Sequence, residues 1–182
     1  GADMEDGGDG NDTLMVLPTG ITVDVTYDLT NGTAGVTGSE MTSAFTNIEN
    51  VKIGYLWSTG EYVGTTQNWT LIGTDGVNQL ESTEGNDVLE GRGGSDILTG
   101  NGGADTFVFK DGEDGTDTIT DFDLAEGDKL DLSSYGITTE EAAEALMSDS
   151  SDGVNVTIDG SVIVTMTATT VADFNAADGW LA

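Results

Sequence analysis

The stretch GTDGVNQLE STEGNDVLE GRGGSDILT GNGGADTFV, residues 73–108, decides the fold of this chain, because it divides into four units of nine residues in one frame. The fourth place of every unit is glycine, and the sixth and eighth places are also fixed in kind. They hold Asn78, Asp87, Asp96 and Asp105 at the sixth place, and Leu80, Leu89, Leu98 and Phe107 at the eighth. A solvated Gly/Asp-rich loop is the alternative, but four in-frame units with a constant apolar place favour a stacked repeat architecture.

Within one unit we expect a turn over places one to six and a short strand over places seven to nine. Glycine at the first place of three units and at the fourth place of all four permits positive φ and lets carbonyl groups point inward. Alternation along the strand directs the eighth-place side chain into the core. One turn offers too few oxygen atoms for Ca²⁺, which takes about six to eight. A stacked neighbour therefore has to supply the remaining ligands.

These units resemble the glycine-rich nonapeptide of RTX (repeats-in-toxin) proteins, a calcium-binding parallel β-helix repeat. The resemblance implies an all-β fold: a parallel β-roll, that is, a calcium-bound β-solenoid, with irregular flanking strands and a C-terminal cap of a β-hairpin and a short helix. It also implies that one coil is two units, so that each unit stacks on the next but one. Asn78 then pairs with Asp96, and Asp87 with Asp105. Several Ca²⁺ ions would lie between the stacked turns.

By the same resemblance, one turn contributes the carbonyl groups of places one and three, its neighbour those of places two and four, and both their sixth-place side chains. The ligands implied in this way are Gly73, Asp75, Asn78, Ser82, Glu84, Asp87, Gly91, Arg92, Gly93, Gly94, Asp96, Gly100, Asn101, Gly102, Gly103 and Asp105. Asn78 offers a neutral oxygen, so we expect a weaker site beside it. Ser82, Arg92 and Asn101 stand where the family has glycine, which keeps the carbonyl but reduces the freedom of the turn.

Partial units flank the four good ones. GGDGNDTLM (7–15) supplies Asp9 and Asp12 as further expected ligands, although their stacking partner within 16–72 is not obvious. FKDGEDGTD (109–117) continues the frame as the last half-coil, with Gly112 and Asp114 at its fourth and sixth places and Thr116 at its eighth. The segment 115–136 resembles the end of RTX rolls, where Ile119, Phe122, Leu124, Leu130 and Leu132 would seal the last coil. Its acidic residues Asp117, Asp121 and Asp123 form either another calcium site or a solvated loop.

The composition excludes several classes of function. Lys and Arg number 4 against 34 Asp and Glu, a formal charge of -30, so the chain lacks the basic surface of a nucleic-acid binder or of a protein drawn to anionic membranes. Cysteine and histidine are absent, which excludes disulfides, thiolate sites, His-ligated zinc and Ser-His triads. A halophilic surface would also be acidic, but it would not explain the nine-residue register.

Before the repeats, the segments 21–29 and 46–56 read as strands, with a turn at Asn31-Gly32. The insert 57–69 and the residue just before it bring together Tyr55, Trp57, Tyr62 and Trp69. These aromatic side chains either close the open end of the β core or stack on a glycan.

After the repeats, Thr138 and Glu141 resemble a capping box that opens a short helix through Met147. Residues 154–168 predict a hairpin turning at Asp159-Gly160. The last stretch, TTVADFNAADGWLA (169–182), resembles the C-terminal target segment of type I secretion substrates; otherwise it is an amphipathic turn packed on the hairpin.

We therefore expect three regions: 1–72 with a partial repeat, degenerate strands and the aromatic insert, 73–117 as the calcium-binding roll, and 118–182 as the cap and secretion segment. The first residues, GADMEDGGDGND, lack an initiator Met and open within a repeat, which suggests a piece of a longer protein. The expected function is a calcium-binding module, itself not an enzyme, that folds outside the cell after type I export. The alternatives are a structural module of an extracellular assembly or homo-oligomer, and the non-catalytic tail of a secreted enzyme.

Overall fold

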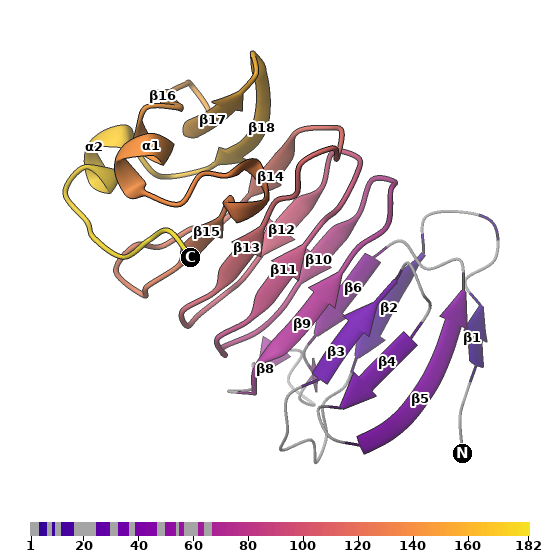
Figure 1. Ribbon diagram of the computed structural model, residues 1–182. Helices are drawn as coiled ribbons and strands as arrows, with labels where there is room; N and C mark the ends of the chain where they lie inside the picture. Colours follow the sequence, from indigo (N-terminus) through magenta and orange to yellow (C-terminus); the bar gives the residue numbers. More distant parts are fainter. Residues whose placement is uncertain are drawn as a thin grey trace.

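A computed structural model describes residues 4–6, 9, 12–16, 25–29, 33–36, 39–46, 50–53, 55–56, 62–63 and 67–182. Two sheets of eight strands each stack coil upon coil into a parallel β-roll, with the N-terminal strands at one end and the helices at the other (Figure 1). In spatial order, sheet A contains β1 (Met4–Asp6), β5 (Ser39–Thr46), β4 (Thr33–Val36), β3 (Val25–Asp28), β9 (Trp69–Ile72), β11 (Val88–Glu90), β13 (Thr106–Val108) and β15 (Lys129–Asp131). Sheet B contains β16 (Met147–Asp149), β17 (Val154–Ile158), β18 (Ser161–Met166), β14 (Asp117–Ile119), β12 (Ile97–Thr99), β10 (Gln79–Glu81), β6 (Asn50–Ile53) and β2 (Thr13–Val16).

The four central units confirm the predicted coil. Places seven to nine of each unit form a strand, and successive strands alternate between sheets B and A. The pairing is parallel, with Leu80 opposite Leu98 and Leu89 opposite Phe107. Each unit therefore stacks on the next but one, so that side chains of the same place form columns through the roll.

The eighth-place side chains form two columns, one in each sheet, which are the core of the roll. Leu80, Leu89, Leu98 and Phe107 are all 0% exposed. Beyond the four units, the sheet A column continues through Leu71 and Leu130 and the sheet B column through Ile119, which are equally buried. Full burial of one such side chain contributes about 1.5–3 kcal/mol, so this repeated place is the main apolar contribution to folding.

The fifth unit differs from the predicted frame. β14 begins at Asp117, and Ile97 pairs with Thr118, so the stacking offset is 21 residues instead of the 18 of the central coils. Ile119, not Thr116, occupies the core place. The assignment of Gly112 and Asp114 to the fourth and sixth places is therefore wrong. Three extra residues lengthen this turn, and outer turns accept such insertions because they lie on the surface.

The N-terminal repeat has a stacking partner that the sequence did not reveal. β2 pairs in parallel with β6, with Thr13 opposite Asn50, so Asp12 lies directly before the strand that stacks on residues 50–53. Of the predicted strand 21–29, β3 is the described part, and it pairs antiparallel with β4. Residues 31–32, the predicted turn between them, lie outside the described residues.

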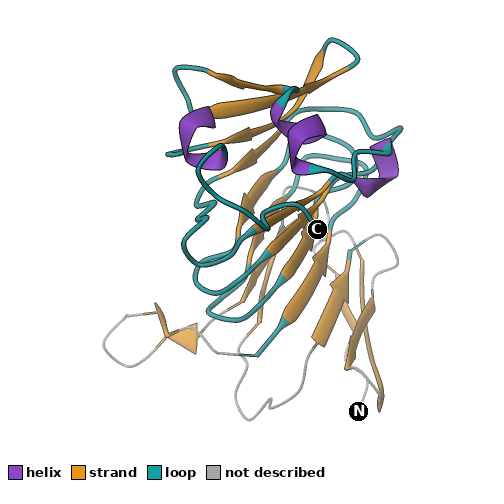
Figure 2. Ribbon diagram, turned by 60° about the vertical axis from the view of Figure 1, so that its left-hand side comes forward, coloured by secondary structure: helices purple, strands orange, loops and turns teal. Residues whose placement is uncertain are grey.

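The C-terminal cap closes the other end of the roll, where the helices gather (Figure 2). The hairpin prediction is confirmed: β17 and β18 pair across Asp159 and Gly160, which have φ of 51° and 82°. The capping-box prediction is wrong by one residue. Helix α1 (Glu140–Glu144) has Thr139 as its N-cap, whose side chain accepts from the Ala142 amide, and residue 147 already belongs to β16.

The apolar residues expected to seal the last coil do so together with the C-terminal segment. Helix α2 (Val171–Phe174) and the one-turn 3₁₀-helix η1 (Ser133–Tyr135) belong to this cap. Phe122 contacts Phe107 of the roll and Phe174 of α2, with ring centroids 6.0 and 5.5 Å apart. Trp180 is buried edge-on against Phe174, and the Leu130 amide donates to the Trp180 carbonyl. The residues 169–182 therefore pack as an integral part of the folded end.

Candidate metal centre

Two rows of turns flank the roll, one on each side. The first row, residues 73–78, 91–96 and 112–117, leads into β10, β12 and β14 of sheet B. The second row, residues 82–87, 100–105 and 121–128, leads into β11, β13 and β15 of sheet A. Every residue predicted to bind calcium in the four units belongs to one of these rows.

The sixth-place side chains form a hydrogen-bonded ladder between coils. In the first row, the backbone amide of Asn78 donates to Asp96 Oδ1 at 2.7 Å, and the backbone amide of Asp96 donates to Asp117 Oδ1 at 2.9 Å. In the second row, the Asp87 amide donates to Asp105 Oδ1 at 2.8 Å. Each of these carboxylates therefore fixes the position of the coil before it.

Two members of the ladder were missed or misassigned from the sequence. The Asp105 amide donates to Asp128 Oδ1 at 2.9 Å, 23 residues along the chain, and Asp117 takes the place predicted for Asp114. The signal for both is the triplet of Asp, any residue and an apolar residue: Asp117-Thr118-Ile119 and Asp128-Lys129-Leu130 repeat the pattern of Asp87-Val88-Leu89. Asp128 Oδ2 also accepts from the Asp123 amide, so Asp128 closes the second-row ladder.

The second carboxylate oxygen of two ladder residues has no protein donor. Asp96 Oδ2 and Asp105 Oδ2 are buried and lack a hydrogen-bond partner within the described part of the chain. Desolvation raises the pKa of Asp96 to about 6, and desolvation together with the negative charges of Asp87 and Asp128 raises that of Asp105 to about 8. Burial likewise raises the pKa of Asp117 to about 7. Burying an ionised carboxylate without a partner is costly, so these positions call for a cation.

Glycine at the first and fourth places makes room for this arrangement. A Cβ at Gly91 or Gly100 would overlap the sixth-place carboxylate of the same turn, Asp96 or Asp105. Gly94 and Gly103 have φ of +106° and +120°, and a Cβ on either would strike the backbone of the turn stacked beneath. The sixth-place carboxylate therefore lies against first-place backbone, and the fourth-place backbone of successive coils is in close contact.

The donor set fits calcium, which prefers carboxylate and carbonyl oxygens. No group of three or more acidic side chains in the described residues is arranged to hold an ion. Any site in the rows would thus combine one or two sixth-place side chains with backbone carbonyl groups. The side chains of Asp75, Glu84 and Asp114 are exposed, so only the backbone of these residues lies within the stacked turns.

The remaining predicted ligands have other roles in the structure. The Asp121 carboxylate accepts from the amides of Gly100 and Asn101 at 3.1 and 2.7 Å, and burial raises its pKa. The Asp12 carbonyl accepts from the Asn50 amide at 3.1 Å, while Asp9 is exposed. Asp121 thus tethers the last coil, and Asp12 joins the first repeat to β6.

Of the four aromatic residues proposed either to close the β core or to stack on a glycan, the structure describes the side chain of Trp69. Trp69 is 1% exposed and packs near Tyr27 in sheet A, so its ring cannot stack on a sugar. Tyr55 and Tyr62 lie in the two-stranded hairpin of β7 (Tyr55–Leu56) and β8 (Tyr62–Val63). Trp57 lies outside the described residues.

Comparison with known families agrees with this geometry. The family model described as RTX calcium-binding nonapeptide repeat (4 copies) matches residues 1–15 and 72–107. A comparison with curated proteins found no match. Within the described residues, no helix has the length and apolar character needed to cross a membrane.

Proposed function

Since the chain is an RTX calcium-binding repeat protein, we propose that it is a folding switch: a module that is exported unfolded and acquires its structure from extracellular Ca²⁺. The observation that carries the proposal is the pair of buried carboxylate oxygens, Asp96 Oδ2 and Asp105 Oδ2, one in each row of turns. In a folded chain without a cation, these groups are desolvated and have no hydrogen-bond partner within the part of the chain that the structure describes. Calcium supplies the missing positive charge there.

The residues that would hold the ions are the sixth-place side chains and the backbone carbonyl groups of the stacked turns. In Asp96 and Asp105, Oδ1 accepts the backbone amide of the stacked coil and so fixes its register, while Oδ2 is available to bind an ion. The backbone amide of the neutral Asn78 donates to Asp96 Oδ1, and the side-chain oxygen of Asn78, Oδ1, accepts from the backbone amide of Thr74 at 2.6 Å. This use of Asn78 Oδ1 supports the prediction of a weaker site beside it.

The energetic coupling follows from mass action. Each ion that binds only the folded chain stabilises it by RT ln(1 + [Ca²⁺]/Kd), about 2.7 kcal/mol at a hundredfold excess over Kd. Two or three ions would match the free energy of unfolding of an ordinary domain, roughly 5–15 kcal/mol. Without the ions, repulsion among the charges of a chain with formal charge -30 and 27 glycines opposes the compact state, and apolar burial does not offset it.

Export in the unfolded state suits this coupling. We propose that low cytosolic Ca²⁺ keeps the chain extended for the type I machinery and that residues 169–182 serve as its target segment. The same residues then pack against Phe122 and Leu130 at the folded end. The chain itself performs no catalysis in this proposal.

Calcium titration followed by circular dichroism tests the proposal. In excess chelator the spectrum should be that of a largely disordered chain, and added Ca²⁺ should restore the β signal cooperatively. Trp69, buried in the middle of sheet A, and Trp180, buried in the C-terminal cap, should report the same midpoint by fluorescence. A β spectrum that chelator leaves unchanged would refute the switch.

A second candidate is a structural module in an extracellular assembly. The observation in its favour is that β1 and β2 are the terminal strands of their sheets, because each pairs on one side only among the described strands. Unpaired strand edges are sites of further β pairing. Calcium-dependent oligomers in sedimentation that disappear when residues 1–15 are removed would favour this candidate.

A further inference from the structure

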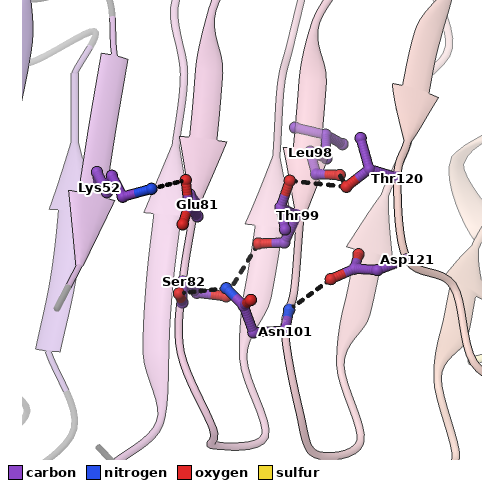
Figure 3. A network of polar contacts seen from close by, with 8 residues as sticks. All are labelled: Lys52, Glu81, Ser82, Leu98, Thr99, Asn101, Thr120 and Asp121. Carbon is purple, nitrogen blue, oxygen red and sulfur yellow. Dashed lines mark hydrogen bonds and ion pairs between the residues drawn. The ribbon is translucent and has the colours of Figure 1, made fainter. Parts of the chain in front are cut away.

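Asn101 joins three successive coils in the second row of turns. Its side chain reaches the coil before it, where Nδ2 donates to the Ser82 carbonyl at 2.8 Å, and its backbone amide donates to Asp121 Oδ2 of the coil after it at 2.7 Å (Figure 3). The residue is exposed and has φ of 62°, a conformation that Asn adopts more readily than most residues. The geometry of Asn101 therefore depends on the stacking of its neighbours.

Asn101 is followed by Gly102, and this dipeptide is chemically labile. In an Asn-Gly sequence the backbone nitrogen of glycine attacks the side-chain carbonyl carbon of asparagine, because no Cβ hinders the approach. The new C–N bond closes a five-membered succinimide, and the side-chain nitrogen leaves as ammonia with the proton that the glycine nitrogen loses. Water then opens the ring to aspartate or to isoaspartate, in which the main chain runs through the side chain.

Packing does not require glycine at position 102. The φ of Gly102 lies outside the left-handed region, and the atoms nearest to a Cβ there are Glu84 Cγ at 3.8 Å and Glu126 Oε2 at 4.0 Å, ordinary van der Waals distances. The third place of other turns holds a side chain, as in Asp75 and Glu84. The fold therefore tolerates a side chain at this position, which allows the chemistry to be blocked without disturbing the turn.

We propose that Asn101-Gly102 is a self-modification site that the stacking of the coils protects, and that its deamidation removes a bond between coils. Attack on the Asn101 side chain needs that side chain to turn about its own bonds, and in the stacked turn the contacts with Ser82 and Asp121 oppose the rotation. In the unfolded chain these contacts are lost, so the dipeptide reacts as it would in a free peptide. Because the proposed function makes stacking depend on Ca²⁺, the inference rests on it: the ion then sets the rate at which the chain is modified.

The product lacks the property that the contact between coils uses. Aspartate has no N–H to donate, so the Ser82 carbonyl loses this donor and faces a carboxylate oxygen instead. Isoaspartate also lengthens the main chain and shifts the turn residues that follow it. A chain that has been kept without calcium should therefore fold less readily when calcium is added.

Peptide mass spectrometry of the full chain measures the reaction, as the mass gained when the amide at residue 101 becomes an acid. The chain is incubated in Ca²⁺, in excess chelator, and in Ca²⁺ with denaturing urea. The rate at residue 101 should be at least about tenfold lower in Ca²⁺ than in urea, because modification of the folded chain requires local opening. In urea, Asn31-Gly32 provides an internal reference, since it is the other Asn-Gly dipeptide of the sequence.

Rates in Ca²⁺ and in urea that agree within about twofold would overturn the inference. The chelator sample tests the proposed function separately. A rate in chelator as low as that in Ca²⁺ would mean that the fold does not need the ion, while protection by stacking would still stand on the comparison with urea.

Gly102→Ala tests the chemistry. It should lower the rate at residue 101 in urea about tenfold or more, since the new Cβ hinders attack by the nitrogen of residue 102. The calcium concentration at half folding, followed by circular dichroism, should not change, because the Cβ has room. An unchanged rate in urea would mean that this nitrogen takes no part, and the proposed site would be refuted.

Asn101→Asp reproduces the aspartate product and should raise the calcium concentration at half folding by about twofold or more. Asn86→Asp is the matched control, because it adds the same charge to the same row of turns. Asn86 Oδ1 accepts from the backbone amide of Ala104 at 3.0 Å, and a carboxylate preserves that bond. Equal shifts in the two variants would show that charge alone acts, which would overturn the claim that deamidation removes a contact between coils.

Discussion

Replacing Asp105 by Asn should change the stability of the roll in opposite directions with and without calcium. Asp105 is 0% exposed, its Oδ1 accepts from the Asp87 amide, and its Oδ2 has no partner in the described part of the chain. Asn preserves the size of the side chain and the Oδ1 acceptor but removes the charge. Asn78 shows that the sixth place accepts an amide side chain.

The magnitude follows from the shift of the Asp105 pKa. Burial raises that pKa from 3.8 to about 8, so at about pH 7.5 the folded, metal-free chain must either take up a proton or bury a charge. The corresponding loss of stability is on the order of 5 kcal/mol. Asp105→Asn avoids this loss, so in chelator it should retain more β structure than the wild type. In saturating Ca²⁺ it should bind at least one ion fewer and unfold at lower urea concentration.

Circular dichroism in chelator, calcium stoichiometry from isothermal titration calorimetry and urea unfolding in Ca²⁺ measure these effects. Asp178→Asn is the control, because Asp178 is exposed and the change in net charge is the same. If both variants shift the chelator state and the stoichiometry equally, the effect is general charge screening and the reasoning from the buried site is refuted.

Three further predictions concern pH, the turns and the core. In chelator, the wild type should gain β signal by circular dichroism as the pH falls from about 8 to about 4. The raised pKa values of Asp105 and Asp117 make the folded state bind more protons than the unfolded state, so the stability of the fold decreases as pH rises through that window. A signal that is flat or decreases on acidification would contradict this. Gly103→Ala should lower the free energy of unfolding in urea with Ca²⁺ by about 2 kcal/mol or more, since residue 103 has φ of +120° and its new Cβ would meet the Gly85 carbonyl. Gly112→Ala, at φ of +92° in open space, should cost only about 1–2 kcal/mol of backbone strain. Equal losses would show that the contact between stacked turns is unimportant. Leu98→Ala should lower the free energy of unfolding by about 2–5 kcal/mol while leaving calcium stoichiometry unchanged, and a change in stoichiometry would mean that core and metal sites are not separable.

The coil itself could be predicted from the sequence because its constraints are local and repeat. Each unit has one large apolar residue at its eighth place and a glycine at its fourth. Their constant spacing of nine residues predicts the position of each strand, the side chain that it buries and the offset at which the coils stack. The structure places Leu80 and Leu98 in one buried column in sheet B, and Leu89 and Phe107 in another in sheet A, as the pattern predicts.

The last two coils could not be placed by period alone, because their turns change length. The stacking offset grows from 18 residues to 21 at Asp117 and to 23 at Asp128, while the triplet of Asp, any residue and an apolar residue is kept. What stacking fixes is the ladder carboxylate and the core side chain two residues later. The outer part of the turn lies at the surface, where insertions cost little.

The start of α1 shows a different limit. Thr138 and Thr139 are both acceptable N-caps, and local preference does not distinguish them. The structure uses Thr139, and the resulting helix has Ala143 fully buried. Which face of a short helix is buried depends on tertiary packing, which the local sequence does not contain.

The two oxygens of one carboxylate explain how folding and calcium binding become inseparable in this chain. Asp105 Oδ1 holds the preceding coil in register, so the side chain has to be buried for the coils to stack. Burial of the group then leaves Oδ2 desolvated and without a donor among the described residues. A side chain that only bound metal could turn to solvent when the ion leaves, and the fold would survive. Here the ladder bond and the metal-binding oxygen belong to the same group, so releasing the ion penalises the bond that stacks the coils.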